Sequence, residues 1–134
     1  MSGQKAVIDV EGMAETIFNE LGSGFNESIY QKAFEVLLRE KGLAYEDQRI
    51  VPIYFHSHCV GEGIPDLVIW ENGQPVMVIE LKSQKGNIVE KDKQQLRNYM
   101  RVVNINTGFV VNFPAPGSNE IPEKPEVAEV KLNE

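Results

Sequence analysis

The amino-acid sequence predicts an α/β domain in which one mixed β-sheet is flanked by helices. Apolar residues recur at helical spacing in three segments, and short runs of β-forming residues lie between and after them. The expected order is helix, helix, three strands in antiparallel succession, helix and strand, with a further edge strand near the C-terminus. The 134 residues, 42% hydrophobic and 25% charged, have the size and composition of a single globular domain.

Two helices are expected at the N-terminal end. The first covers residues 10–21, because Ala14, Ile17, Phe18 and Leu21 repeat at helical spacing before a GSG sequence. The second starts after Asn26, a residue suited to an N-cap, and stops at Gly42; its apolar stripe is Tyr30, Phe34, Leu37 and Leu38. Glu27 lies one turn before Tyr30 on that stripe, so a carboxylate is expected to point inward.

The remaining elements follow from runs of β-forming residues and one more helical stripe. Strands are expected over 45–55, over 60–70 with a break at Pro65, over 76–82 and over 108–113, and a helix over roughly 88–103. Residues 1–113 are expected to form the domain. Residues 114–134 read as a Pro-rich acidic segment in which 127–132 alternates weakly and can add an edge strand.

The hairpin PDLVIWENGQPVMVIELK, residues 65–82, carries three ionisable groups where its arms meet. A two-residue Asn-Gly turn would place Asp66 opposite Ile79, on the other face from Glu80. A three-residue turn, 71–73, with Gly73 in a left-handed bulge position, would place Asp66 opposite Val78. Asp66, Glu80 and Lys82 would then share a face, with the carboxylates as diagonal neighbours, so this register is favoured.

Such a pair of acids needs a positive partner. Two carboxylates about 4 to 5 Å apart repel by roughly 3 to 4 kcal/mol at an effective dielectric of about 20, and Glu27 would add to this. A hard cation such as Mg²⁺ accepts these oxygen ligands, and Lys82 on the same side could orient a water or stabilise charge on a phosphate. Phosphodiester hydrolysis uses these parts. The alternative is that the three residues form a solvated rim or a surface ion pair.

The charge distribution qualifies the acidic balance of the chain. The formal net charge is −7, which by itself argues against a nucleic-acid partner. Residues 82–101, however, hold six basic and two acidic residues, a local charge of +4. This stretch is either the solvated face of a helix or an edge that follows phosphates.

Some classes of protein and site are excluded or disfavoured. No apolar run reaches the roughly 20 residues that span a membrane, and the N-terminus lacks a secretory pattern, so an intracellular, cytoplasmic location is expected. Cys59 is the sole cysteine, which excludes an internal disulfide framework. His56, His58 and Cys59 fall short of a structural zinc pattern and fit a solvated hairpin tip better.

Several motifs resemble those of one nuclease superfamily. Pro65-Asp66 followed by Glu80-Leu81-Lys82 is similar to the PD-(D/E)xK motif. Gly24, Glu27 and Tyr30 match the G-x-x-E-x-x-Y signature of the small GxxExxY-type proteins of that superfamily, and Gln95 with Tyr99 resembles their Q-L-x-x-Y element. The resemblance runs from about residue 14 to residue 113 in the expected order.

The resemblance implies a restriction-endonuclease-like core and a site for Mg²⁺ or Mn²⁺. It makes Asp66 and Glu80 metal ligands, with the Leu81 backbone carbonyl as a candidate third, and Lys82 the catalytic lysine. The remaining implied contributors are Glu27, as an additional catalytic acid and candidate ligand, and Gln95, as a supporting polar residue.

The leading functional hypothesis is therefore a metal-dependent nuclease acting on DNA. The resemblance does not distinguish DNA from RNA as the substrate, and some proteins with this fold have lost catalytic activity. A non-catalytic nucleic-acid-binding or protein-interaction module is the alternative. An acidic domain of this size offers little surface to grip DNA, so a homodimer or a larger protein partner is expected.

Overall fold

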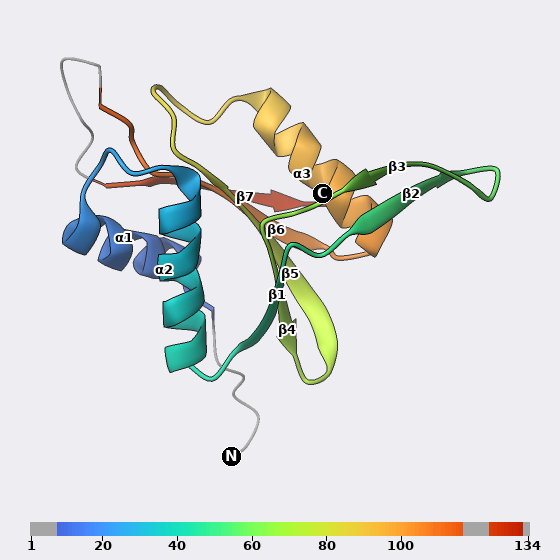
Figure 1. The fold of residues 1–134 in the computed structure, drawn as a ribbon, viewed down its shortest axis with the longest axis horizontal. Coiled ribbons are helices and arrows are strands. Elements are labelled where there is room, and N and C mark those ends of the chain that lie inside the picture. The colour runs from blue at the N-terminus through green and yellow to red at the C-terminus, as the bar shows by residue number, and fades with distance from the viewer. Residues whose placement is uncertain (1–7, 117–123, 133–134) are drawn as a thin grey trace.

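A computed structural model describes residues 8–116 and 124–132, and a five-stranded mixed sheet forms its centre (Figure 1). The strand order is β1-β4-β5-β6-β7, with β5 and β6 parallel and the other neighbours antiparallel. The strands are β1 (Ala44–Asp47), β4 (Leu67–Glu71), β5 (Gln74–Lys82), β6 (Thr107–Asn112) and β7 (Glu126–Lys131). The helices are α1 (Val10–Leu21), α2 (Glu27–Glu40) and α3 (Glu90–Val103).

The helices cover opposite faces of the sheet (Figure 1). Helices α1 and α2 pack on the face that carries Leu67, Ile79 and Leu81, and α3 packs on the face that carries Val68 and Val78. Because side chains alternate between the faces of a strand, β4 and β5 are apolar on both sides. This is the expected α/β architecture of a mixed sheet flanked by helices.

The helix predictions are confirmed with small changes at the ends. Helix α1 has the predicted bounds, and the Asp9 carboxylate accepts a hydrogen bond of 3.0 Å from the Gly12 N–H at its start. Asn26 is the N-cap of α2, and Gly42 follows that helix with a φ of 72°. Helix α3 begins at Glu90, two residues later than expected.

The prediction of three strands before α3 is wrong, because each of the first two expected strands is divided. The segment 45–55 gives β1 and β2 (Val51–Phe55), separated by Gln48, which has a φ of 57°. The segment around Pro65 gives β3 (His58–Gly63) and β4, with the predicted break at Pro65. Strands β2 and β3 form a separate two-stranded sheet.

The predicted three-residue turn between β4 and β5 is also wrong. Glu71 pairs with Gln74, and the two residues between them, Asn72 and Gly73, have φ values of 53° and 77°. These left-handed values are those of a type I′ turn.

A bulge then restores the shared face that the sequence analysis favoured. Trp70 pairs with Pro75 whereas Ile69 pairs with Met77, so Val76 is an extra residue on β5. Pro75 has no N–H to donate to the ladder, which accounts for the irregularity beside it. The shifted register continues through Leu67 and Ile79, and its extension by one residue aligns Asp66 with Glu80, in agreement with the hydrogen bond from the Asp66 N–H to the Glu80 carboxyl group.

The C-terminal strand is part of the same sheet. Strand β7 pairs with β6 at the edge, as predicted, and buries Val130 against the α3 side. Part of the predicted Pro-rich linker, residues 117–123, lies outside the described residues. Residues 1–7, for which the absence of a secretory pattern was predicted, lie outside them as well. The division of the chain at residue 113 remains a prediction. Within the described residues, the helices are too short or too polar to span a membrane.

Candidate active site

Two carboxylates lie side by side where β4 begins and β5 ends. The Asp66 N–H donates to Glu80 Oε1 at 2.9 Å, and the Leu81 N–H donates to Asp66 Oδ2 at 2.7 Å. Each acid therefore uses one oxygen to accept a backbone hydrogen bond from the strand segment that carries the other acid. This reciprocal arrangement fixes both carboxylates, and it follows from the bulged register that places Asp66 opposite Glu80.

The backbone of Leu81 faces the same acids. Within a strand, the N–H and C=O groups of one residue point to the same side, and the Leu81 N–H is bonded to Asp66. The Leu81 carbonyl is thus directed toward β4, whereas the carbonyl of Lys82 accepts from Phe113 N–H on the β6 side at 2.9 Å. The structure consequently brings this predicted carbonyl to the edge of the acid pair.

Lys82 lies on the α3 face and is held there by Asp92. Its Nζ is 3.6 Å from Asp92 Oδ1, and only 24% of the lysine side chain is exposed. Asp92 also accepts a hydrogen bond of 3.1 Å from the Val89 N–H at the start of α3. The same carboxylate therefore orients the lysine and caps the helix.

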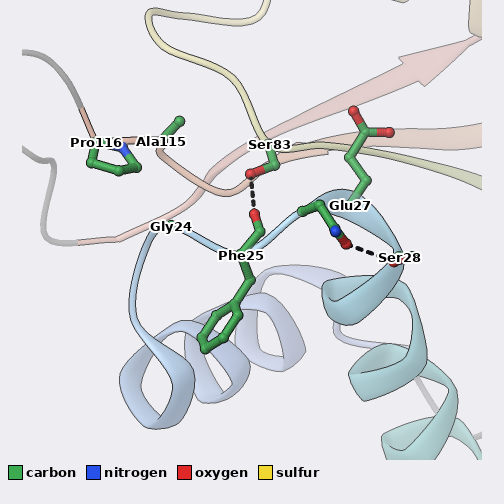
Figure 2. Close-up of a pocket in the computed structure, with 8 residues that line it drawn as sticks. Gly24, Phe25, Glu27, Ser28, Ser83, Ala115 and Pro116 are labelled. Carbon is green, nitrogen blue, oxygen red and sulfur yellow. Dashed lines mark hydrogen bonds between the residues drawn. The ribbon is translucent and has the colours of Figure 1, made fainter.

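Glu27 approaches the acids from the first residue of α2. Its side chain is solvent-exposed, which contradicts the prediction that it points inward. The preceding loop is held by Ser83, whose hydroxyl donates to the Phe25 carbonyl at 2.7 Å (Figure 2). Buried Tyr30 holds the same loop, since its hydroxyl donates to the Gly22 carbonyl at 2.6 Å. The negative charge of Glu27 contributes to the raised pKa values of Asp66 and Glu80, although burial is the larger cause for both.

An open cavity of about 560 Å³ begins beside Glu27 (Figure 2). Its walls come from the loop before α2 and from the chain just after β5 and β6. The lining residues are Gly24, Phe25, Asn26, Glu27, Ser28, Ser83, Ala115 and Pro116. Ser83 directly follows Lys82 in the chain, but Asp66, Glu80 and Lys82 are not among the lining residues of this cavity.

Gln95 is not brought into contact with the carboxylates in the described part of the chain. Its side chain is exposed on α3, and its amide donates to the Tyr99 hydroxyl at 3.4 Å. The predicted supporting role of Gln95 is therefore not accompanied by a hydrogen bond to either acid in the described residues, and it remains a prediction.

Burial perturbs both acids. Glu80 is 9% exposed, and this burial, followed by the charge of Asp66, raises its pKa from 4.5 to about 8. Burial likewise raises the pKa of Asp66; the Leu81 N–H and Lys82 lower it, and the charge of Glu27 raises it. Both shifts favour the protonated form, so the two acids resist ionising together in the absence of a cation.

Comparisons with known proteins identify the family. The sequence profile described as the PD-(D/E)XK nuclease superfamily matches residues 4–123. The chain belongs to this superfamily. The GxxExxY subgroup suggested by Gly24, Glu27 and Tyr30 remains a prediction.

Solved structures of similar fold include an exonuclease. An alkaline exonuclease from Laribacter hongkongensis, LHK-Exo, has a TM-score of 0.52 and 14% identity, covering 91% of this chain and 68% of its own. The protein SSO0001 has a TM-score of 0.54 and 20% identity, covering 78% of this chain and 48% of its own, so the chain spans about half its length. No curated protein sequence matches. The restriction-endonuclease-like fold expected from the motifs is confirmed.

The PD-(D/E)XK acids have the donor chemistry for a hard divalent cation. In the described residues, no three His, Cys, Asp or Glu side chains converge as a metal cluster. Mg²⁺, however, characteristically binds through one or two carboxylates and completes its shell with waters and substrate phosphates. Asp66 and Glu80 each keep a second oxygen beyond the backbone bond, and a cation bound there would favour the ionised form of both acids. The residues present fit such an ion.

Three residues that support the PD-(D/E)XK site were missed in the sequence. Asp92 orients Lys82, and Gln31 donates to the Asp66 carbonyl at 3.3 Å. Asn112 is 2% exposed and bonds the backbone of Gln84 and Gly86, just after Lys82. Asp92 had one readable signal, its position three residues into a helix, where capping acids are common. The other two depend on long-range packing.

The remaining candidates lie at the surface. His56, His58 and Cys59 are exposed at the tip of the β2–β3 hairpin, as expected for a solvated turn. On α3, Arg97 is paired with Glu90 at 2.9 Å, whereas Lys91 is exposed beside the start of the helix.

Proposed function

We propose that this domain is a metal-dependent nuclease that hydrolyses phosphodiester bonds in nucleic acid, with DNA as the expected substrate. The observation that carries the proposal is the pair of partly buried Asp66 and buried Glu80, each bonded to the strand segment of the other, beside Lys82, which is paired with Asp92. Membership of the PD-(D/E)XK superfamily supports the class of reaction.

Asp66, Glu80 and the Leu81 carbonyl would hold Mg²⁺ or Mn²⁺. When bound, such an ion polarises the phosphate and lowers the pKa of a bound water, which supplies the nucleophile. The backbone hydrogen bonds to Asp66 Oδ2 and Glu80 Oε1 keep the carboxylates in place without any rearrangement, so the site is organised before substrate arrives.

Lys82 supplies positive charge next to the reacting phosphate. Its ammonium group can donate to a phosphate oxygen as negative charge develops there, or orient the attacking water. The ion pair with Asp92 limits the rotamers of Lys82 and aims Nζ along the α3 side of the strand. The cavity beside Glu27 has a volume within the usual range for ligand sites, and it is the proposed path for the nucleotide next to the cleaved bond.

Labelled single-stranded, duplex and branched DNA, and RNA, incubated with Mg²⁺ or Mn²⁺ test the proposal. Cleavage is expected for wild type and for Lys85→Ala, an exposed lysine in the following loop, and is expected to be lost in Lys82→Ala. If no substrate is cut, or if Lys82→Ala cuts like wild type, the proposed reaction is wrong.

A non-catalytic nucleic-acid-binding module is the second candidate, because the acid pair lacks a third converging side chain in the described residues. It predicts salt-sensitive binding that Lys82→Ala weakens only by the loss of one charge. Protein interaction through residues 114–134 predicts instead that deleting this segment abolishes capture of the partner.

A further inference from the structure

Helix α2 carries a second apolar stripe beside the one that packs into the core. The first stripe begins with Tyr30 and is buried. The second follows helical spacing through Ile29, Ala33, Val36 and Leu37; Ile29 and Val36 are 41% and 43% exposed, and the other two are half-buried. A surface helix of a globular domain normally has one apolar stripe, so a second, exposed stripe marks a candidate contact surface.

This stripe lines a groove between α2 and α1, the two helices that share one face of the sheet (Figure 1). Two cavities of about 260 Å³ and about 350 Å³ adjoin there, since both are lined by Thr16 of α1 and Leu37 of α2. The first extends to Leu21 and the second to Asp9, so the groove follows all of α1. The twelve residues of α1 span about 18 Å, enough for about three turns of a bound helix.

The border of the groove is acidic at one end. Glu20 and Glu40 line the first cavity, and the described residues around them there include no Lys or Arg. Neither carboxylate forms an ion pair with another described residue. At the other end, Asp9 and Lys41 balance each other. An occupant with positive groups at the first end would therefore pair with two acids that the domain leaves open.

The charges of the two helical layers select the class of occupant. Helices α1 and α2 together carry six acidic and two basic residues, a formal charge of −4, whereas α3 carries two acidic and four basic residues, a charge of +2. Nucleic acid and anionic membrane surfaces are repelled by the α1–α2 layer, and a second copy docked there would bring the same acids together. An occupant that is both apolar and basic matches the groove.

We propose that the α1–α2 groove binds an amphipathic helix of a partner protein, with apolar side chains in the groove and Lys or Arg side chains against Glu20 and Glu40. The apolar anchors of this helix recur at i, i+3 or i+4, and i+7, the spacing of a helix bound in a groove. The contact is small, so the expected Kd lies between about 1 and 100 µM. Asp66 and Glu80 do not line the groove, and the proposal does not depend on nuclease activity.

Selection from helical peptides displayed as a library tests the proposal on the full chain. The peptides carry Leu, Ile, Met or Phe at the anchor positions, and Lys and Arg at the flanking positions in one pool or Asp and Glu in the other. The chain should select the basic pool, with a Kd below about 100 µM by fluorescence polarisation and weaker binding at high salt. Amide NMR signals of Thr16 and Val36 should shift on titration. The absence of such a binder, equal selection from the acidic pool, or shifts confined to α3 or the β2–β3 hairpin overturns the proposal.

Substitution of the exposed stripe tests the apolar part of the contact. Val36→Lys should weaken the selected peptide by at least about tenfold, because a charge then lies where an apolar side chain must be buried. Val60→Lys, on the hairpin where the native side chain is 62% exposed, adds the same charge and should bind like wild type. Circular dichroism checks folding, and Val36→Ser replaces the lysine variant if that variant fails to fold. A peptide that binds the Val36 variant as tightly as wild type contradicts the proposed groove.

Reversal of the two acids tests the charged part. Glu20→Lys combined with Glu40→Lys should weaken binding by at least about tenfold at low salt, since two attractive pairs become repulsive. Glu11→Lys combined with Glu62→Lys makes the same change in net charge at exposed positions outside the groove and should weaken binding by less than about threefold. Equal losses in the two double variants would mean that the peptide responds only to net charge, and would overturn the assigned site.

Discussion

Replacing Glu80 with Gln should stabilise the metal-free protein at neutral pH. The amide has the shape of the carboxyl group and keeps an oxygen to accept the Asp66 N–H, but it has no ionisable proton at this buried position, which is 9% exposed. Burial raises the pKa of Glu80 from 4.5 to about 8. The folded chain therefore holds a proton on Glu80 that the unfolded chain releases, and folding becomes less favourable as pH rises from about 4.5 to about 8.

The magnitude follows from this difference in proton binding. Between pH 4.5 and pH 7 the free energy of unfolding falls by about 1.4 kcal/mol per pH unit, so the accumulated loss is about 3 kcal/mol at pH 7. Glu80→Gln does not lose this stability, so its free energy of unfolding should exceed that of wild type by about 3 kcal/mol at pH 7. For a chain of this size, the difference corresponds to about 10 °C in Tm. Below pH 4.5 the difference should largely vanish.

Urea unfolding in EDTA at pH 4, 7 and 8.5 measures these free energies. Glu40→Gln, at the exposed end of α2, is the control and should change stability by less than about 0.5 kcal/mol. Adding Mg²⁺ at pH 8.5 should raise the Tm of wild type and not that of Glu80→Gln, because only wild type has both carboxylates. A Gln variant no more stable than wild type at pH 7 would refute the reasoning about buried charge.

Three further substitutions test the supporting structure. Asp92→Asn loses the ion pair to Lys82 but keeps an oxygen for the cap, so nuclease activity should fall about tenfold with little change in Tm, measured on the substrate that wild type cuts. Asn112→Ala removes the three hydrogen bonds that this buried side chain makes to the backbone of Gln84 and Gly86, and it should cost about 2 to 4 kcal/mol in urea unfolding. Gly108→Ala would place a Cβ 2.6 Å from Met100 Sδ, and this overpacking should cost about 1 to 3 kcal/mol by the same assay.

Each of these substitutions has a matched control in the chain. Glu90→Gln breaks the neighbouring ion pair to Arg97 and should leave the nuclease rate unchanged; an equal loss of rate would remove the special role of Asp92. Asn87→Ala is exposed and Gly61→Ala meets no atom within 4 Å, so both should unfold like wild type. Equal stability of Asn112→Ala or Gly108→Ala with these controls would contradict the packing around α3 and β6.

Local patterns were enough to predict most elements. Helix α1 has the bounds given by its apolar spacing and by Gly22, and Asn26 and Gly42 mark the ends of α2. Such signals work because helix ends and apolar faces depend on residues within a few positions of each other. Strand lengths were less predictable, since β1 and β2 belong to different sheets although they are adjacent in the sequence.

The candidate site shows the limit of local patterns more clearly. Asn72-Gly73 indicated the turn, and the charge pattern indicated that Asp66, Glu80 and Lys82 belong together. The predicted register was nevertheless wrong, because the shift comes from Val76 and not from the turn. Pro75 was a local signal for this bulge, but only pairing with β4 shows where the ladder resumes.

The sequence by itself determined the helices, the outline of the sheet and the identity of Asp66, Glu80 and Lys82 as candidate site residues. Each of these features depends on residue types and short spacings. Only the tertiary structure decided that Asp66 lies opposite Glu80, that Asp92 orients Lys82 and that Glu27 is exposed. These relations join segments that are far apart in the chain or on different elements. They depend on strand register and on the packing of α2 and α3 across the sheet, which short sequence patterns do not specify.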